Sequence, residues 1–213
     1  MNRSQSTLVL HALVVIAALL LLVPALTQAL GGQLGYLLSL TVYWLGFCIP
    51  VIALHSWKRH DGRLFSEKLA WRDWWVPLLL LLQVVAIGIA AFFQNTTHLT
   101  TRGAMLAAAI AIINAPLEEA AWRGGFMVRF VDKPRLGFWL GWLLFTAWHI
   151  PLALSHGVAF DGGWVSLVGG AAALGLLWSW IAWRTGSVFW VAIAHVLTNV
   201  LTFWVFFDRN GFV

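Results

Sequence analysis

Seven apolar runs, each about 20 residues long, follow one another along this 213-residue chain. A run of that length crosses the roughly 30 Å of hydrocarbon in a lipid bilayer. Backbone groups inside a bilayer must be hydrogen-bonded within the protein, and these runs lack the two-residue alternation of barrel strands. The pattern therefore predicts membrane-spanning helices at residues 8–27, 34–54, 76–93, 104–129, 136–154, 164–183 and 188–207.

The composition favours a membrane protein over a soluble one. Hydrophobic residues make up 61% of the chain and charged residues only 10%, with a mean hydropathy of +0.84. A soluble domain is nearer half apolar and a quarter charged. We therefore expect an all-α fold, a polytopic transmembrane helical bundle that forms a single integral membrane domain over residues 1–213.

The first apolar run has a second possible interpretation. Arg3 precedes it and Thr27-Gln-Ala29 follows it, as in a signal peptide cleaved after Ala29. The run is long for a signal peptide and further spans follow, which favours a retained first helix. The single cysteine, Cys48, excludes a disulfide framework within the chain.

Basic residues gather on one side of a seven-span chain. The opposite side receives only Arg102 and Arg209. Since cytoplasmic loops are enriched in Lys and Arg, we expect a cytoplasmic N-terminus. The basic residues mix with Trp57, Trp71, Trp74 and Trp75, which suits contact with lipid headgroups and gives no reason to expect nucleic-acid binding. The basic side comprises Arg3, Lys58, Arg59, Arg63, Lys68, Arg72, Arg129, Lys133, Arg135 and Arg184.

The predicted span at 104–129 contains three ionisable residues. Charged side chains at membrane depth are costly, so an intramembrane cluster indicates a functional site. Glu119 and Arg123 are four residues apart on one helix face, where an ion pair can form. Glu118 points about 100° away from Glu119, so the two carboxylates need not share a role.

Two later spans carry polar side chains at a matching depth. His149 lies in the fifth span, and His195 and Asn199 lie one turn apart in the seventh. Singly, each has a structural explanation, such as a backbone hydrogen bond or an interhelical contact. At 1.5 Å per residue, however, four side chains reach roughly 16–22 Å from the cytoplasmic ends of their helices: Glu118, His149, His195 and Asn199. This common layer predicts a shared buried site.

The order of these motifs resembles the signature of the CPBP intramembrane proteases. Glu118-Glu119-x-x-x-Arg123, Phe145-x-x-x-His149 and His195-x-x-x-Asn199 follow in the family's order, within a motif-bearing core at about 104–207. The family includes CAAX prenyl endopeptidases and bacteriocin-processing or abortive-infection (Abi) proteins. Trp122 departs from the phenylalanine common before the arginine. The short chain and compact loops resemble bacterial members, which implies a bacterial inner membrane.

The resemblance implies a glutamate-type endopeptidase that hydrolyses a peptide bond of a membrane-anchored or lipidated protein or peptide. Glu118 would be the general base, activating water with His149. His195 and Asn199 would donate hydrogen bonds to the oxyanion, a role that suits an amide and an imidazole N–H. Glu119 and Arg123 would support them, and no cofactor is expected.

Two alternatives stay open. Glu118, His149 and His195 could ligate zinc as a His₂Glu set with an open position for water. A proton- or ion-coupled transporter also buries such residues, although the inverted repeats common in transporters are not visible. Candidate substrates are prenylated CAAX tails, leader peptides and C-terminal anchoring tails of exported proteins.

Overall fold

The computed structural model describes residues 1–56 and 63–213, so Trp57, Lys58, Arg59 and His60 lie outside the described residues. Within them, seven helices are long and apolar enough to cross a membrane. This confirms the all-α fold and the seven predicted spans. The spans run over Arg3–Leu30, Gly32–Ser56, Trp71–Thr96, Thr101–Arg129, Pro134–Ala153, Gly163–Thr185 and Phe189–Arg209.

Four of the spans are single α-helices, and three contain changes of helical type. The single ones are α1 (Arg3–Leu30), α7 (Pro134–Ala153), α8 (Gly163–Thr185) and α9 (Phe189–Arg209). The second span comprises α2 (Gly32–Tyr43), η1 (Trp44–Cys48), α3 (Ile49–Val51) and η2 (Ile52–Ser56). The third comprises η5 (Trp71–Asp73), α4 (Val76–Ile87), η6 (Gly88–Phe92) and part of η7 (Phe93–His98). The fourth comprises α5 (Thr101–Glu118), η8 (Glu119–Gly125) and α6 (Phe126–Arg129). A short 3₁₀ turn, η4 (Arg63–Phe65), precedes the third span.

The first helix begins five residues before the apolar run used to predict it. Asn2 and Gln5 form a capping box, in which each side chain accepts a hydrogen bond from the other residue's backbone N–H. Such a cap satisfies backbone donors that the first helical turn leaves unpaired, so the helix extends into polar sequence. The Gln5 side chain also donates to the Arg129 carbonyl, which ties α1 to the end of α6.

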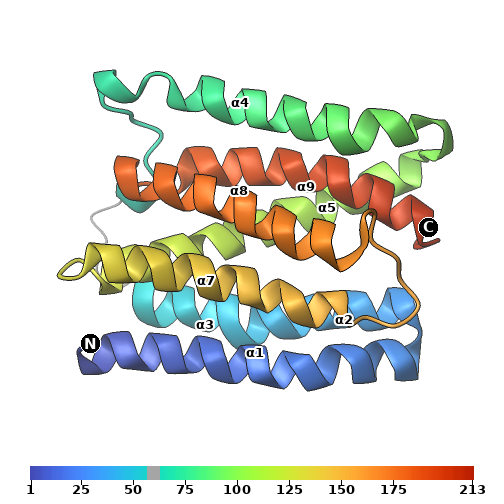
Figure 1. Cartoon of the computed structure of the whole chain (residues 1–213), viewed down its shortest axis with the longest axis horizontal. Helices are drawn as coiled ribbons and strands as arrows, with labels where there is room; N and C mark the ends of the chain where they lie inside the picture. Colours follow the sequence, from blue (N-terminus) through green and yellow to red (C-terminus); the bar gives the residue numbers. More distant parts are fainter. Residues whose placement is uncertain (57–62) are drawn as a thin grey trace.

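The helices run along the long axis of the molecule, with α4 at one edge and α1 at the other in the view of Figure 1. Helix α5 packs along α9, α7 packs along α8, and α4 packs on α9. The largest core lies where α2, η1, η8 and α7 meet. There the Tyr43 ring stacks on Trp148 with centroids 3.7 Å apart, and Phe47 lies 4.1 Å from Trp122. This aromatic core fixes η8 against the second and fifth spans.

The predicted grouping of basic residues at one end is present. The N-terminus lies at one end of the bundle and the C-terminus at the other (Figure 1). Arg3 opens α1, Arg129 closes α6 and Arg184 lies in the last turn of α8, all at the end of the N-terminus. We refer to this as the basic end, and to the opposite one as the C-terminal end.

Candidate active site

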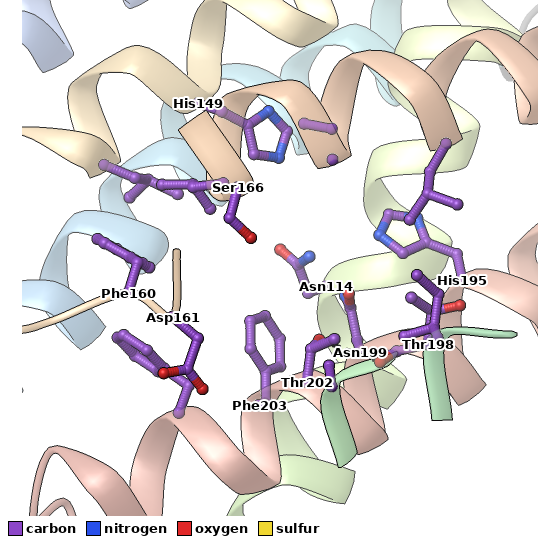
Figure 2. A pocket seen from close by; sticks show the side chains of 18 of the residues that line it. Asn114, His149, Phe160, Asp161, Ser166, His195, Thr198, Asn199, Thr202 and Phe203 are labelled. Atoms are coloured by element: carbon purple, nitrogen blue, oxygen red, sulfur yellow. Dashed lines mark hydrogen bonds between the residues drawn. The ribbon is translucent and has the colours of Figure 1, made fainter. Parts of the chain in front are cut away.

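The four predicted catalytic side chains line one cavity. Its volume is about 280 Å³, and Glu118, His149, His195 and Asn199 all contribute to its wall. Figure 2 shows His149, His195 and Asn199 around this cavity, together with Asn114. The common depth inferred from helix length therefore corresponds to a common cavity. Glu119 and Arg123 are buried beside it.

Glu118 lies where the fourth span changes from α-helix to π-helix. It is the last residue of α5, and η8 continues the chain with wider π turns. Single π turns inside α-helices recur at functional sites, because they re-aim the side chains that follow. Gly124 and Gly125 end the π segment, and a Cβ on either would meet a side chain 2.8 Å away. Their lack of a side chain allows the close packing of η8.

His195 lies between the two glutamates. Its Nδ1 is 2.8 Å from Oε1 of Glu119, and its Nε2 is 3.5 Å from Oε2 of Glu118. The Trp178 ring stacks on the imidazole with centroids 4.2 Å apart. The two carboxylates that are adjacent in sequence therefore face opposite nitrogens of a single ring, in agreement with the expectation that they need not share a role.

All three nitrogens of the Arg123 guanidinium donate hydrogen bonds. Its Nη1 donates to Oε1 of Glu119 at 3.1 Å, which is the ion pair expected from the spacing. Its Nη2 donates to the Gly175 carbonyl at 3.1 Å and its Nε donates to Oγ of Ser179 at 3.3 Å, both on α8. Its Cζ lies 3.9 Å from the centre of the Phe145 ring. Gly175 allows this close approach, since a Cβ there would come within 2.8 Å of that ring.

Asn114 is a site residue that the sequence analysis missed. Its Nδ2 donates to Oε2 of Glu118 at 3.2 Å, and its Oδ1 accepts from Nε1 of Trp44 at 2.8 Å. The signal was available, because a polar residue four positions before Glu118 shares its helix face. With Oε2 held in this way, Oε1 of Glu118 is buried without a hydrogen-bond partner among the described residues.

His149 projects from α7 with a fixed ring orientation. Its Nδ1 is 2.8 Å from the Phe145 carbonyl oxygen, so Nδ1 carries the hydrogen and donates it. In the neutral ring Nε2 is then a hydrogen-bond acceptor. The Phe145 ring contacts the imidazole edge-on at 4.9 Å. The four-residue spacing places the Phe145 carbonyl within hydrogen-bond distance of the His149 ring, and this bond fixes the tautomer of His149.

Asn199 contributes a free amide to the cavity. Its Nδ2 is buried and has no hydrogen-bond partner within the described part of the chain. The preceding residue, Thr198, accepts a hydrogen bond at 3.0 Å from Nε2 of Gln83. Oε1 of Gln83 accepts in turn from Nε1 of Trp178 at 3.2 Å. Gln83 was also missed, although it is the one polar side chain in Val76–Ile87 of α4.

The candidate zinc ligands do not come together as a metal-binding group. In residues 1–56 and 63–213, no three His, Cys, Asp or Glu side chains are close enough to hold one ion. Glu118, His149 and His195 share the cavity, and Nδ1 of each histidine is already hydrogen-bonded, which leaves the two Nε2 atoms as possible ligands. It is the spacing of the described side chains, and not their chemistry, that gives no support to a His₂Glu centre.

One comparison with known proteins returned a match. Residues 100–201 match the family model described as type II CAAX prenyl endopeptidase Rce1-like. The matched segment spans α5 to α8 and α9 as far as residue 201, and it contains all six predicted site residues. No curated protein and no solved structure matches the chain.

Proposed function

Because residues 100–201 place this integral membrane protein in the CPBP (CAAX protease) family of peptide hydrolases, we propose that it is an intramembrane endopeptidase of the glutamate type. It hydrolyses a peptide bond of a membrane-associated protein or peptide with water activated by Glu118 and His149. The observation that carries this proposal is the geometry of Glu118. One carboxylate oxygen is held by Asn114 and faces His195, while the other is buried in the cavity wall without a hydrogen-bond partner among the described residues.

The cavity supports a complete water-activation step. A water molecule donates one hydrogen to Oε1 of Glu118 and the other to Nε2 of His149, the acceptor left by its bond to Phe145. As the water oxygen bonds the scissile carbonyl carbon, Glu118 takes up a proton and the carbonyl oxygen becomes negative. Glu118 then delivers that proton to the amide nitrogen and the C–N bond breaks, which gives a carboxylic acid and an amine. Transfer of the acid's proton to the amine yields a carboxylate and an ammonium as the final products.

Asn199 and His195 stabilise the oxyanion in this proposal. Nδ2 of Asn199 is a donor with no competing partner in the described part of the chain, which suits a preorganised oxyanion site. Since Nδ1 of His195 faces Glu119, its Nε2 donates a hydrogen bond when the ring is protonated. Glu119 and Arg123 act through His195 by fixing the orientation of its ring.

Reconstitution into liposomes tests this function. Purified protein is mixed with a set of synthetic apolar peptides, and cleavage is followed by mass spectrometry while a dye inside the liposomes reports proton flux. We expect cleavage by the unaltered chain and none by Glu118→Gln of equal melting temperature. Unchanged cleavage by Glu118→Gln would remove the general-base role. Proton flux without cleavage would favour the transporter alternative.

Metal dependence is a separate proposal. We expect the purified enzyme to hold substoichiometric zinc and to keep its activity through prolonged chelation. Ligating histidines must be deprotonated, so a zinc enzyme would instead lose metal and activity together on acidification or chelation. Stoichiometric zinc that disappears with activity in His195→Ala would overturn the metal-free mechanism.

A further inference from the structure

The cavity is asymmetric along the bundle. Its inner wall contains Glu118 and His195, which are 1% and 4% exposed. Its outer wall contains Asp161 in the loop before α8, Ser166 near the start of α8 and Arg209 at the end of α9, all at the C-terminal end of the bundle (Figure 1). Among the described residues, none at the basic end lines it. The cavity therefore opens from the catalytic layer toward one end of the molecule, the end opposite the basic loops.

An ion pair borders this opening. Asp161, in the loop between α7 and α8, pairs with Arg209 at the end of α9. The two side chains are 40% and 55% exposed, whereas the layer beneath them is aromatic. There the Phe160 ring stacks on Phe206 at 5.1 Å, and Tyr36 lies 5.0 Å from Phe206. Charged groups at the rim and aromatic rings below suit a peptide whose apolar side chains enter the cavity.

The depth of the cavity determines how many residues of a substrate peptide it can hold. Arg209 follows Asn199 by ten residues of α9, which is about 15 Å along the helix. An extended peptide covers about 3.3 Å per residue, so about five residues reach from the rim to the oxyanion position. A substrate therefore presents its scissile bond about five residues inside the opening.

We propose that the substrate enters at the C-terminal end, past the Asp161–Arg209 pair, as an extended apolar segment. The basic end faces the cytoplasm by the distribution of Lys and Arg, so this opening faces the outer side of the membrane. The substrate class that fits is an apolar anchoring segment of an exported protein. A cytoplasmic prenylated tail would reach the opposite end. The identity of the segment as substrate rests on the proposed function, but the side and route of access do not.

Cysteine labelling tests the route without any substrate. Cys48, the only cysteine, is buried and is replaced in a Cys48→Ala background. Thr202→Cys probes the cavity from α9, and Ser166→Cys probes its rim from α8. Ser4→Cys marks the basic end, and Ser39→Cys, fully buried, is the unreactive control. A membrane-impermeant methanethiosulfonate is added to right-side-out and inverted vesicles.

We expect Thr202→Cys and Ser166→Cys to react in right-side-out vesicles and Ser4→Cys to react in inverted ones. Replacing the ion pair by Asp161→Ala should accelerate labelling of Thr202→Cys by up to about fivefold, the range available to an exposed ion pair. Arg102→Ala, at the same end but outside the cavity lining, should leave the rate unchanged. Melting temperatures verify that each variant is folded.

The outcomes separate this proposal from the proposed function. The access route is overturned if Thr202→Cys is labelled from the same side as Ser4→Cys. It is also overturned if Thr202→Cys is labelled from neither side while Ser4→Cys reacts. Reaction of both Ser4→Cys and the cavity probes in the reversed vesicle types overturns the outward orientation and with it the exported substrate. Labelling as expected in a chain that cleaves no peptide supports the route and counts against the protease function alone.

Discussion

The first three spans and the last four differ in what they contribute to the site. The segment from α5 to α9 supplies every predicted catalytic and supporting side chain. The segment from α1 to α4 presents large apolar side chains outward, such as Leu21 at 76% exposed, and lies outside the family match. Yet its few polar groups bond the site directly, through Trp44 to Asn114 and Gln83 to Thr198. The chemistry is thus located in one half, and its geometry depends on both.

Glu118→Gln in the second half should have the largest effect. The substitution keeps the shape of the side chain and removes the base, so we expect a rate loss of up to about 10⁴-fold. The hydrogen bond with Asn114 persists if the amide carbonyl is its acceptor, so the melting temperature should stay close to that of the unaltered chain. Cleavage rate and thermal unfolding in detergent are the two measurements. A rate loss explained by unfolding would contradict the assignment.

Arg123→Ala should lose stability as well as activity. The substitution leaves Glu119 buried and without its ion-pair partner, which typically costs about 3–5 kcal/mol. We expect a lower melting temperature and lower yield. A matched comparison is Arg102→Ala, an exposed arginine in the first turn of α5. An Arg123→Ala protein that is fully stable but inactive would place the guanidinium in contact with substrate.

Asn199→Ala should slow catalysis without a comparable loss of stability. Nδ2 of Asn199 has no hydrogen-bond partner among the described residues, so its removal breaks no protein contact of that atom. Loss of one oxyanion donor costs about 10²–10³-fold in kcat. Steady-state kinetics should show kcat falling with little change in KM. A change confined to KM would instead indicate a role in substrate binding.

Gln83→Leu tests the contribution of the first half and should have the smallest effect. It removes the bonds that fix Trp178 over His195 and Thr198 beside Asn199. A hydrogen bond between neutral groups contributes about 0.5–1.5 kcal/mol, so kcat should fall by up to about tenfold. Gln94→Leu, exposed in the same span, is the matched control. Equal kinetics for both variants would mean that the first three spans do not contribute to catalysis through Gln83.

Much of the fold was predictable because membrane insertion imposes simple constraints. Each apolar run had to be helical and of about bilayer length, which placed all seven spans to within a few residues. The errors fell at helix ends, where local hydrogen bonds decide the boundary, as the Asn2–Gln5 cap does for α1. Helical geometry also gave the Glu119–Arg123 ion pair and the common depth of the polar residues.

The contacts between helices were beyond the sequence patterns. Nothing in the spacing of His195 indicates that its two nitrogens face Glu118 and Glu119, or that Trp178 covers its ring. In the sequence, Gln83 is a single polar residue in an apolar span, and its role becomes visible only from the packing of α4 on α9. Such contacts depend on the rotation of each helix about its axis, which is set by side-chain packing rather than by hydropathy.

The sequence by itself therefore determined the membrane helices, the set of polar residues and their common layer, because length, rise per residue and the cost of buried charge depend on local chain properties. The tertiary structure decided which oxygen of Glu118 has no hydrogen-bond partner among the described residues, which nitrogen of His149 accepts, and at which end the cavity opens. Those features arise where side chains from six spans meet, and only close packing of the whole bundle fixes their mutual orientation.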